Sequence, residues 1–172
     1  SFDELLQHYR TSGEKVGRRE QLIIGDDPQW LAAAERLAPH QPTDARALWV
    51  WLLQQSQQPA IREAAANGFI ASCANAPLDP LTLAFAQRFE SLLQPAARLL
   101  AGAAADRLQR PEEAVAFWKY RPLAEPLDQA WFVRLIHNIA ATGDLPLLEE
   151  KLQAWPAQLS ADDAQTIANE LS

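Results

Sequence analysis

The sequence predicts an all-α protein, built as an irregular stack of about nine or ten short helices. Apolar residues recur at helical spacing through most of the 172 residues. Asp27-Pro28 and Asp79-Pro80 each place an N-cap acceptor before a proline that suits the first helical turn. No segment shows the alternation and turn dipeptides of a β-hairpin, so the sequence carries no convincing strand or hairpin signal.

The N-terminal part predicts two helices separated by a basic connection. Ser1 and Glu4 form a capping box, and we expect the first helix to end near Gly13. Residues 13–20 (GEKVGRRE) then form a solvated connection, and residues 21–24 are ambiguous between a helix end and a short extended piece. The second helix starts at Asp27-Pro28 and ends before the prolines at positions 39 and 42.

Residues 47–53 (ALWVWLL) form the most apolar run of the chain. Seven consecutive apolar residues are compatible with a buried strand, but the cap at Thr43-Asp44 favours a helix. A helix that is apolar on all sides needs cover from several neighbours, so we expect it at the centre of the stack. The alternative is that Trp49 or Trp51, which point nearly opposite ways, marks an interface with a second chain.

The remaining helices follow from the same signals of proline starts, acidic first turns and glycine ends. We expect an interruption of the helix of residues 59–74 at Asn67-Gly68, and a central pair of helices whose second member is stopped by Pro122 and Pro126. Ser160 is expected to cap the last helix. The predicted helices from here to the C-terminus cover residues 59–74, 80–94, 96–109, 111–121, 127–141, 146–154 and 161–171.

Part of the chain resembles the tetratricopeptide family. Gly102, Ala114, Trp118 and Pro126 are spaced by 12, 4 and 8 residues, which is similar to that family's pattern of small, small, aromatic and proline positions. Gly143 lies 34 residues after Gln109, the family period, and LPLLEEKLQAW after it reads as another second helix. Four other positions depart from the pattern, namely Arg98, Ala105, Gln109 and Arg121.

The resemblance covers about half of the chain and implies a right-handed α-solenoid of antiparallel helix pairs. A length of 172 residues is that of one domain, so residues 1–172 are expected to form a single domain. It also implies a concave groove formed by the first helix of each pair. An extended peptide or a partner helix would fit this groove, unless another helix of the same chain fills it. The groove positions carried over are Leu99, Ala103, Asp106, Arg107, Val133 and His137.

Composition excludes several classes of partner. The net charge is −7 and the pI about 4.9, which disfavours binding to nucleic acid and attraction to anionic membranes. No apolar run approaches the length that spans a bilayer, so membrane insertion is not expected. The lone Cys73 excludes an internal disulfide and leaves the compartment open between cytoplasm and periplasm for a soluble chain. A monomer is favoured.

No catalytic or metal-ligating constellation stands out. Adjacent carboxylates, as at Asp26-Asp27 and Glu112-Glu113, diverge on a helix and suit the dipole of its first turn. The three histidines lie far apart without ligand spacing, and Cys73 is expected to be a buried thiol. The common nucleotide-binding and hydrolase motifs are absent. We therefore expect no catalytic residues, no metal and no cofactor.

These observations favour a protein-protein interaction module. One alternative is an accessory helical domain of a larger enzyme, which the internal start of the sequence and its lack of methionine would suit. Another is a sugar-binding or carbohydrate-active helical module that uses tryptophans as platforms. That class predicts a deep pocket with a tryptophan face and two carboxyls close together.

Overall fold

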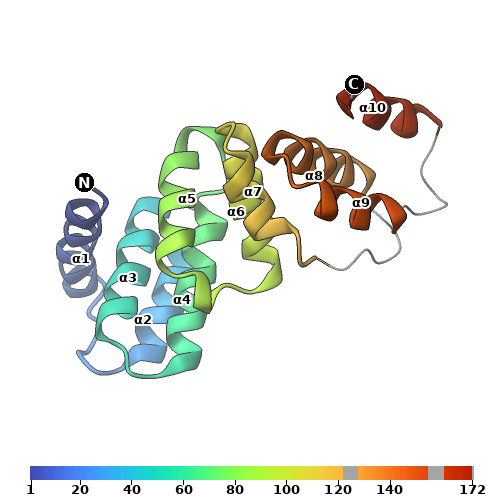
Figure 1. Ribbon diagram of the computed structural model, residues 1–172. Coiled ribbons are helices and arrows are strands. Elements are labelled where there is room, and N and C mark those ends of the chain that lie inside the picture. The colour runs from blue at the N-terminus through green and yellow to red at the C-terminus, as the bar shows by residue number, and fades with distance from the viewer. Residues whose placement is uncertain (122–127, 155–160, 172) are drawn as a thin grey trace. The chain divides into compact units, whose positions relative to one another are not determined.

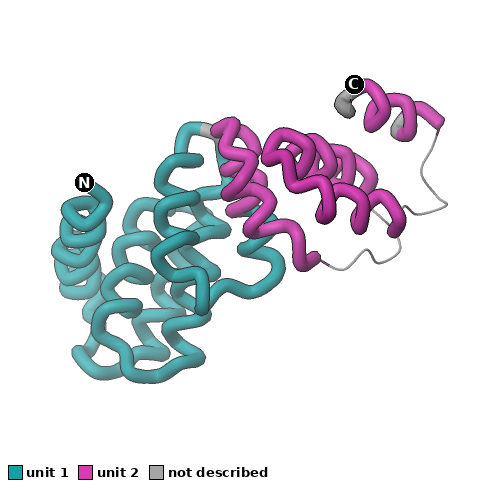
Figure 2. Tube along the Cα trace, viewed as in Figure 1, with its two compact units in different colours: residues 1–100 teal, residues 101–172 magenta. Residues whose placement is uncertain are grey.

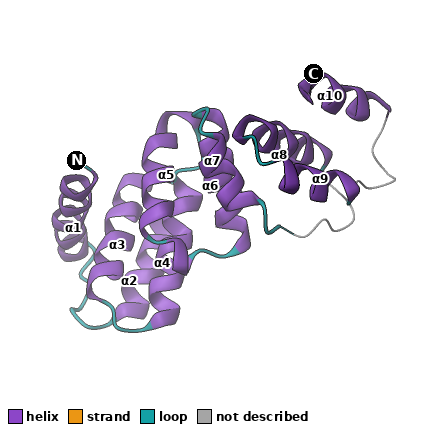
Figure 3. Ribbon diagram, in the orientation of Figure 1, coloured by secondary structure: helices purple, strands orange, loops and turns teal. Residues whose placement is uncertain are grey.

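The computed structural model describes residues 1–121, 128–154 and 161–171, and these residues are almost entirely helical (Figure 1). They form ten α-helices and two short 3-10 helices, and the described part of the chain contains no strand (Figure 3). The prediction of an all-α protein of nine or ten helices is confirmed. The right-handed solenoid arrangement stays a prediction.

The chain divides into two compact units, residues 1–100 and residues 101–172 (Figure 2). The boundary falls inside helix α6, and the single domain expected from the sequence stays a prediction. Unit 1 contains α1 (Phe2–Arg19), α2 (Asp27–Leu37), α3 (Pro42–Gln55), α4 (Pro59–Ser72), η1 (Ala76–Leu78), α5 (Asp79–Arg88), η2 (Glu90–Leu92) and the start of α6 (Pro95–Arg107). Unit 2 contains the rest of α6, α7 (Pro111–Trp118), α8 (Gln129–Thr142), α9 (Leu145–Gln153) and α10 (Ala161–Leu171).

Helix α3 is the centre of unit 1, as predicted for residues 47–53. It packs against α1, α2 and α4, and every residue from Ala45 to Leu53 is buried. Because neighbours cover it on all sides, its continuous apolar run leaves almost no apolar surface exposed to solvent. The strand interpretation of this run is wrong.

Trp49 and Trp51 are core residues on opposite sides of α3. Their exposed fractions are 4% and 5%, respectively. The Trp51 ring stacks on Trp30 of α2 with ring centroids 3.7 Å apart, while the Trp49 ring lies against Gly68 of α4. This is the internal placement that the sequence favoured. The alternative of an interface at one of the two rings has almost no exposed ring surface to build on.

Helix α1 is longer than the sequence predicts, because it continues through Gly13 to Arg19. A Cβ atom on Gly13 would lie 2.5 Å from the carbonyl oxygen of Ala47, so the missing side chain lets α1 approach α3 closely. The expected stop near Gly13 is wrong, because this glycine serves helix packing and not helix termination.

Residues 21–24, which were ambiguous, begin with the C-terminal cap of α1. Gln21 has a φ of 58°, in the left-handed region. The Leu22 amide donates to the Gly17 carbonyl at 2.9 Å and the Gln21 amide donates to the Arg18 carbonyl at 3.1 Å. These two bonds are those of a Schellman motif, which normally places glycine where Gln21 stands.

Helix α4 also passes through its predicted interruption at Asn67-Gly68. The Asn67 side chain donates to the Leu92 carbonyl at 2.9 Å and accepts from the Gln94 amide at 2.8 Å. The two residues therefore tie α4 to its neighbours, Asn67 through these bonds and Gly68 through contact with the Trp49 ring. The helix of residues 80–94 is shorter than predicted, since α5 ends at Arg88 and η2 follows.

Unit 2 shows two helix pairs in the same register. Helices α6 and α8 begin 34 residues apart, and so do α7 and α9. Gln109 and Gly143, which follow α6 and α8, have positive φ values of 57° and 77°. Helix α8 packs against α7, α9 and α10 and supplies more of the buried residues described in this unit than any other helix. The predicted stops at Pro122 and Pro126 and the Ser160 cap lie outside the described residues.

Candidate functional site

Five of the six predicted groove residues belong to unit 2. Ala103 and Asp106 on α6 and Val133 and His137 on α8 are half-buried, and Arg107 is exposed. We call them the α6–α8 face. The sixth predicted position, Leu99, is half-buried at the end of unit 1.

A polar cluster joins the two helices of the α6–α8 face. Arg134 donates from Nε and Nη2 to the two carboxylate oxygens of Asp106, at 2.9 and 2.6 Å. Asn138 donates from Nδ2 to Asp106 at 2.9 Å and to the Arg134 carbonyl at 2.8 Å. The Asp106 side chain is 13% exposed, whereas that of Arg134 is 43% exposed. The carboxylate is thus fixed below the surface and the guanidinium reaches it.

The cluster keeps Asp106 ionised. Burial of the carboxyl acts to raise its pKa, but the hydrogen bonds from Arg134 and Asn138 outweigh burial and hold the pKa of Asp106 below its usual range. His137 adds a smaller effect in the same direction, which places it within electrostatic reach of Asp106. The structure therefore brings two predicted groove residues together.

Arg134 and Asn138 are the functional candidates that the sequence analysis missed. Each directly follows a predicted groove position, Val133 or His137, and the two are four residues apart on α8, so they share its face toward α6. The available signal was the presence of two polar residues at this spacing in a helix that is otherwise mostly apolar.

Unit 1 contains a pocket of about 370 Å³ beside α1. Its buried lining is Gly17, Trp30 and Trp51. The Trp30 ring lies against Gly17 and stacks on Trp51, and its Nε1 donates to the Ile23 carbonyl at 2.8 Å. The more accessible lining consists of Arg10, Glu14, Arg18, Leu22, Ile24 and Gln55. We call this the α1 pocket.

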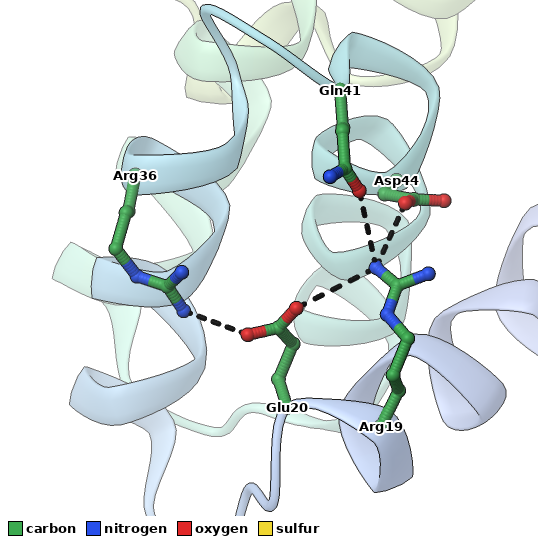
Figure 4. Close-up of polar contacts among 5 residues, drawn as sticks. All are labelled: Arg19, Glu20, Arg36, Gln41 and Asp44. Atoms are coloured by element: carbon green, nitrogen blue, oxygen red, sulfur yellow. Dashed lines mark hydrogen bonds and ion pairs between the residues drawn. The ribbon is translucent and has the colours of Figure 1, made fainter.

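The three arginines of α1 divide into two groups. Arg19 donates to Asp44 at 2.8 Å and to Gln41 at 3.3 Å, and it lies 3.5 Å from Glu20 (Figure 4). Glu20 in turn accepts from Arg36 of α2 at 2.9 Å. This network ties the end of α1 to α2 and α3. Arg10 and Arg18, in contrast, line the α1 pocket.

The described residues contain no group of three histidine, cysteine or acidic side chains placed to hold a metal ion. Burial raises the pKa of the Cys73 thiol, so it stays protonated and weakly reactive, as a core cysteine does. The α1 pocket has tryptophans but a single carboxyl, Glu14, among its lining residues. It therefore lacks the carboxyl pair that a carbohydrate-active site would need.

Comparison with known proteins adds no relative. No family model, no curated protein and no solved structure matches this chain. In the part that the structure describes, no helix has both the length and the apolar character needed to cross a membrane.

Proposed function

We propose that this chain is a protein-protein interaction module that binds a peptide or a helix of a partner protein on the α6–α8 face. The observation that carries the proposal is the Asp106–Arg134–Asn138 cluster, a fixed polar centre with the half-exposed Ala103 and Val133 on the same two helices. A rigid polar group beside apolar surface gives both affinity and register to a bound segment.

The register of unit 2 supports the same proposal. Helix pairs that repeat every 34 residues resemble the arrangement that presents a continuous binding surface in helical repeat proteins. The contact of Gly102 with the Trp118 ring is the close approach that the tetratricopeptide resemblance implies for one such pair. The small side chain of Ala103 leaves room beside the cluster for a side chain of the partner.

Selection from a displayed peptide library tests the proposal. The immobilised full chain is expected to enrich peptides that bind the α6–α8 face. Arg107→Glu or His137→Ala should then weaken binding of the enriched peptides by about tenfold. Arg110→Glu is the matched control, because Arg110 is an exposed arginine of the same unit outside the face. Failure to enrich any peptide, or equal binding to the wild type and to Arg107→Glu, would remove the proposal.

A further inference from the structure

The α1 pocket carries a second inference, which does not rest on the α6–α8 face. Unit 1 has eight arginines, and six of them donate at least one side-chain hydrogen bond. The other two are Arg10 and Arg18, whose side chains have no hydrogen bond or ion pair with any residue that the structure describes. Both of these unpaired guanidinium groups line the same pocket.

Apart from Glu14 and Gln55, the rest of the pocket lining is apolar, and its buried part is held in place. Trp30 is fixed by its stack on Trp51, by contact with Gly17 and by its hydrogen bond to the Ile23 carbonyl. Beside it the loop after α1 exposes two large apolar side chains, with Ile23 63% and Ile24 85% exposed. Exposed isoleucines next to a preformed apolar pocket are typical of a binding surface.

We infer that the α1 pocket binds an acidic segment of a partner protein, through one aromatic or branched apolar side chain flanked by two carboxylates. The apolar side chain enters between Trp51 and Ile24, and the carboxylates pair with Arg10 and Arg18. Guanidinium groups bind carboxylates with good geometry, and the attraction is local, since the chain as a whole carries a charge of −7.

The distance between the two arginines sets the expected distance between the two carboxylates of the bound peptide. Arg10 and Arg18 are eight residues apart on α1, which corresponds to about 12 Å along the helix. An extended peptide advances about 3.3 Å per residue and turns alternate side chains to the same side, so positions i, i+2 and i+4 match this length. Glu14 lies midway between the arginines and disfavours an acid at the central position. The expected order is acid, any residue, apolar, any residue, acid.

Fluorescence anisotropy with the full chain tests this inference. The probe is fluorescein-labelled Gly-Ser-Glu-Ser-Phe-Ser-Glu-Ser-Gly, together with versions that carry Leu or Trp in place of Phe. We expect at least one to bind. Replacing the apolar residue by Ala, or both Glu residues by Gln, should weaken binding by about tenfold.

Variants of the protein locate the site. Arg10→Glu and Arg18→Glu should each weaken binding of the peptide by about tenfold, and Ile24→Asp should weaken it by a similar factor. Lys15→Glu is the matched control, because it makes the same change of charge on the same helix at an exposed position outside the pocket. Arg107→Glu in unit 2 should leave binding unchanged, which separates this inference from the proposed function.

Four results would overturn the inference. The first is failure of all three peptides to bind the wild type, and the second is binding of the Gln peptide as tight as that of the Glu peptide. The third is an equal loss of binding in Lys15→Glu and Arg18→Glu. The fourth is binding of phosphatidylserine vesicles or a single-stranded oligonucleotide, through the same arginines, that is tighter than binding of the peptide. Circular dichroism of each variant confirms that a loss of binding is not a loss of fold. The substituted side chains of Arg18 and Ile24 are exposed and Arg10 is half-buried, so the fold should persist.

Discussion

The stack of Trp30 on Trp51 predicts a measurable coupling between α2 and α3. The rings are nearly parallel, with an interplanar angle of 7° and centroids 3.7 Å apart, and both residues are buried. Replacing either by leucine should lower the free energy of unfolding by about 1–3 kcal/mol, because a large side chain is removed from a packed core. An aromatic pair contributes about 0.5–1.5 kcal/mol beyond burial, so the double variant should lose less than the sum of the single losses by that amount.

Urea denaturation followed by far-ultraviolet circular dichroism measures the four free energies of this cycle. Trp30→Leu also removes the indole donor to the Ile23 carbonyl, which keeps its bond from the Asp26 amide, but that loss occurs with and without Trp51 and cancels. Trp49→Leu is the matched control, since Trp49 lies in the same helix and contacts Gly68 on α4. Trp30 and Trp49 should be additive within about 0.5 kcal/mol. Additivity of Trp30 and Trp51 would refute the stacked geometry, and loss of an oligomer in light scattering would restore the interface alternative.

Two further predictions concern single side chains. Gln109 ends α6 with a φ of 57°, so Gln109→Gly should raise the free energy of unfolding by about 0.5–1 kcal/mol in urea denaturation, and Gln21→Gly should do the same after α1. A loss of stability in both would contradict the cap assignment. Asp106→Asn should cost about 1–2 kcal/mol at pH 7, an amount reduced by the exposure of Arg134. Because the folded pKa of Asp106 lies below its usual value, this difference should persist down to about pH 4 and shrink as the pH falls further; a difference that grows in acid would show that the sign is wrong.

Most helix starts could be predicted from the sequence, because capping residues and prolines close to the start determine them. The Ser1 capping box is present, with the Glu4 amide donating to the Ser1 hydroxyl at 3.3 Å. Pro28, Pro80 and Pro111 lie within the first turn of their helices, as expected, where the proline ring fits without loss of a hydrogen bond. Pro42 also begins its helix, although the sequence analysis took it as a break. The caps predicted at Asp27, Asp79 and Thr43 are wrong, because these residues lie inside their helices, whose N-caps make no side-chain cap hydrogen bond. Such signals need no knowledge of distant residues, so all-α architecture followed from them.

The candidate sites were less predictable because they depend on contacts between distant residues. Asp106 was selected through the resemblance, but its partners Arg134 and Asn138 lie on another helix and 28 and 32 residues away. The α1 pocket was missed because residues 13–20 were assigned to a connection. Helix α1 in fact continues to Arg19. Its face toward the pocket therefore carries Arg10, Glu14 and Arg18 on successive turns, which the sequence analysis did not foresee.

The error at Gly13 reflects how glycine is used in this chain. Of six glycines, only Gly25 and Gly143 have the positive φ of a turn. The other four lie within helices, where glycine costs about 1 kcal/mol relative to alanine. Each of them faces a tryptophan, since a Cβ atom on any of them would clash with an atom of that side chain. The pairs are Gly13 with Trp51, Gly17 with Trp30, Gly68 with Trp49 and Gly102 with Trp118.

This pairing gives a common packing rule to both units. At Gly17, Gly68 and Gly102 the glycine makes a recess on one helix and an indole from another helix fills it, so the backbones approach closely while a large apolar area is buried. At Gly13 the space is taken by the Ala47 carbonyl and the Trp51 Cβ atom. The gain from burying a tryptophan, of about 1.5–3 kcal/mol, exceeds the propensity lost at the glycine. A glycine that marks a recess and a glycine that marks a stop are identical in the sequence. Only the tryptophan that faces the glycine in the folded chain distinguishes the two. In unit 1 two of these tryptophans, Trp30 and Trp51, also line the α1 pocket.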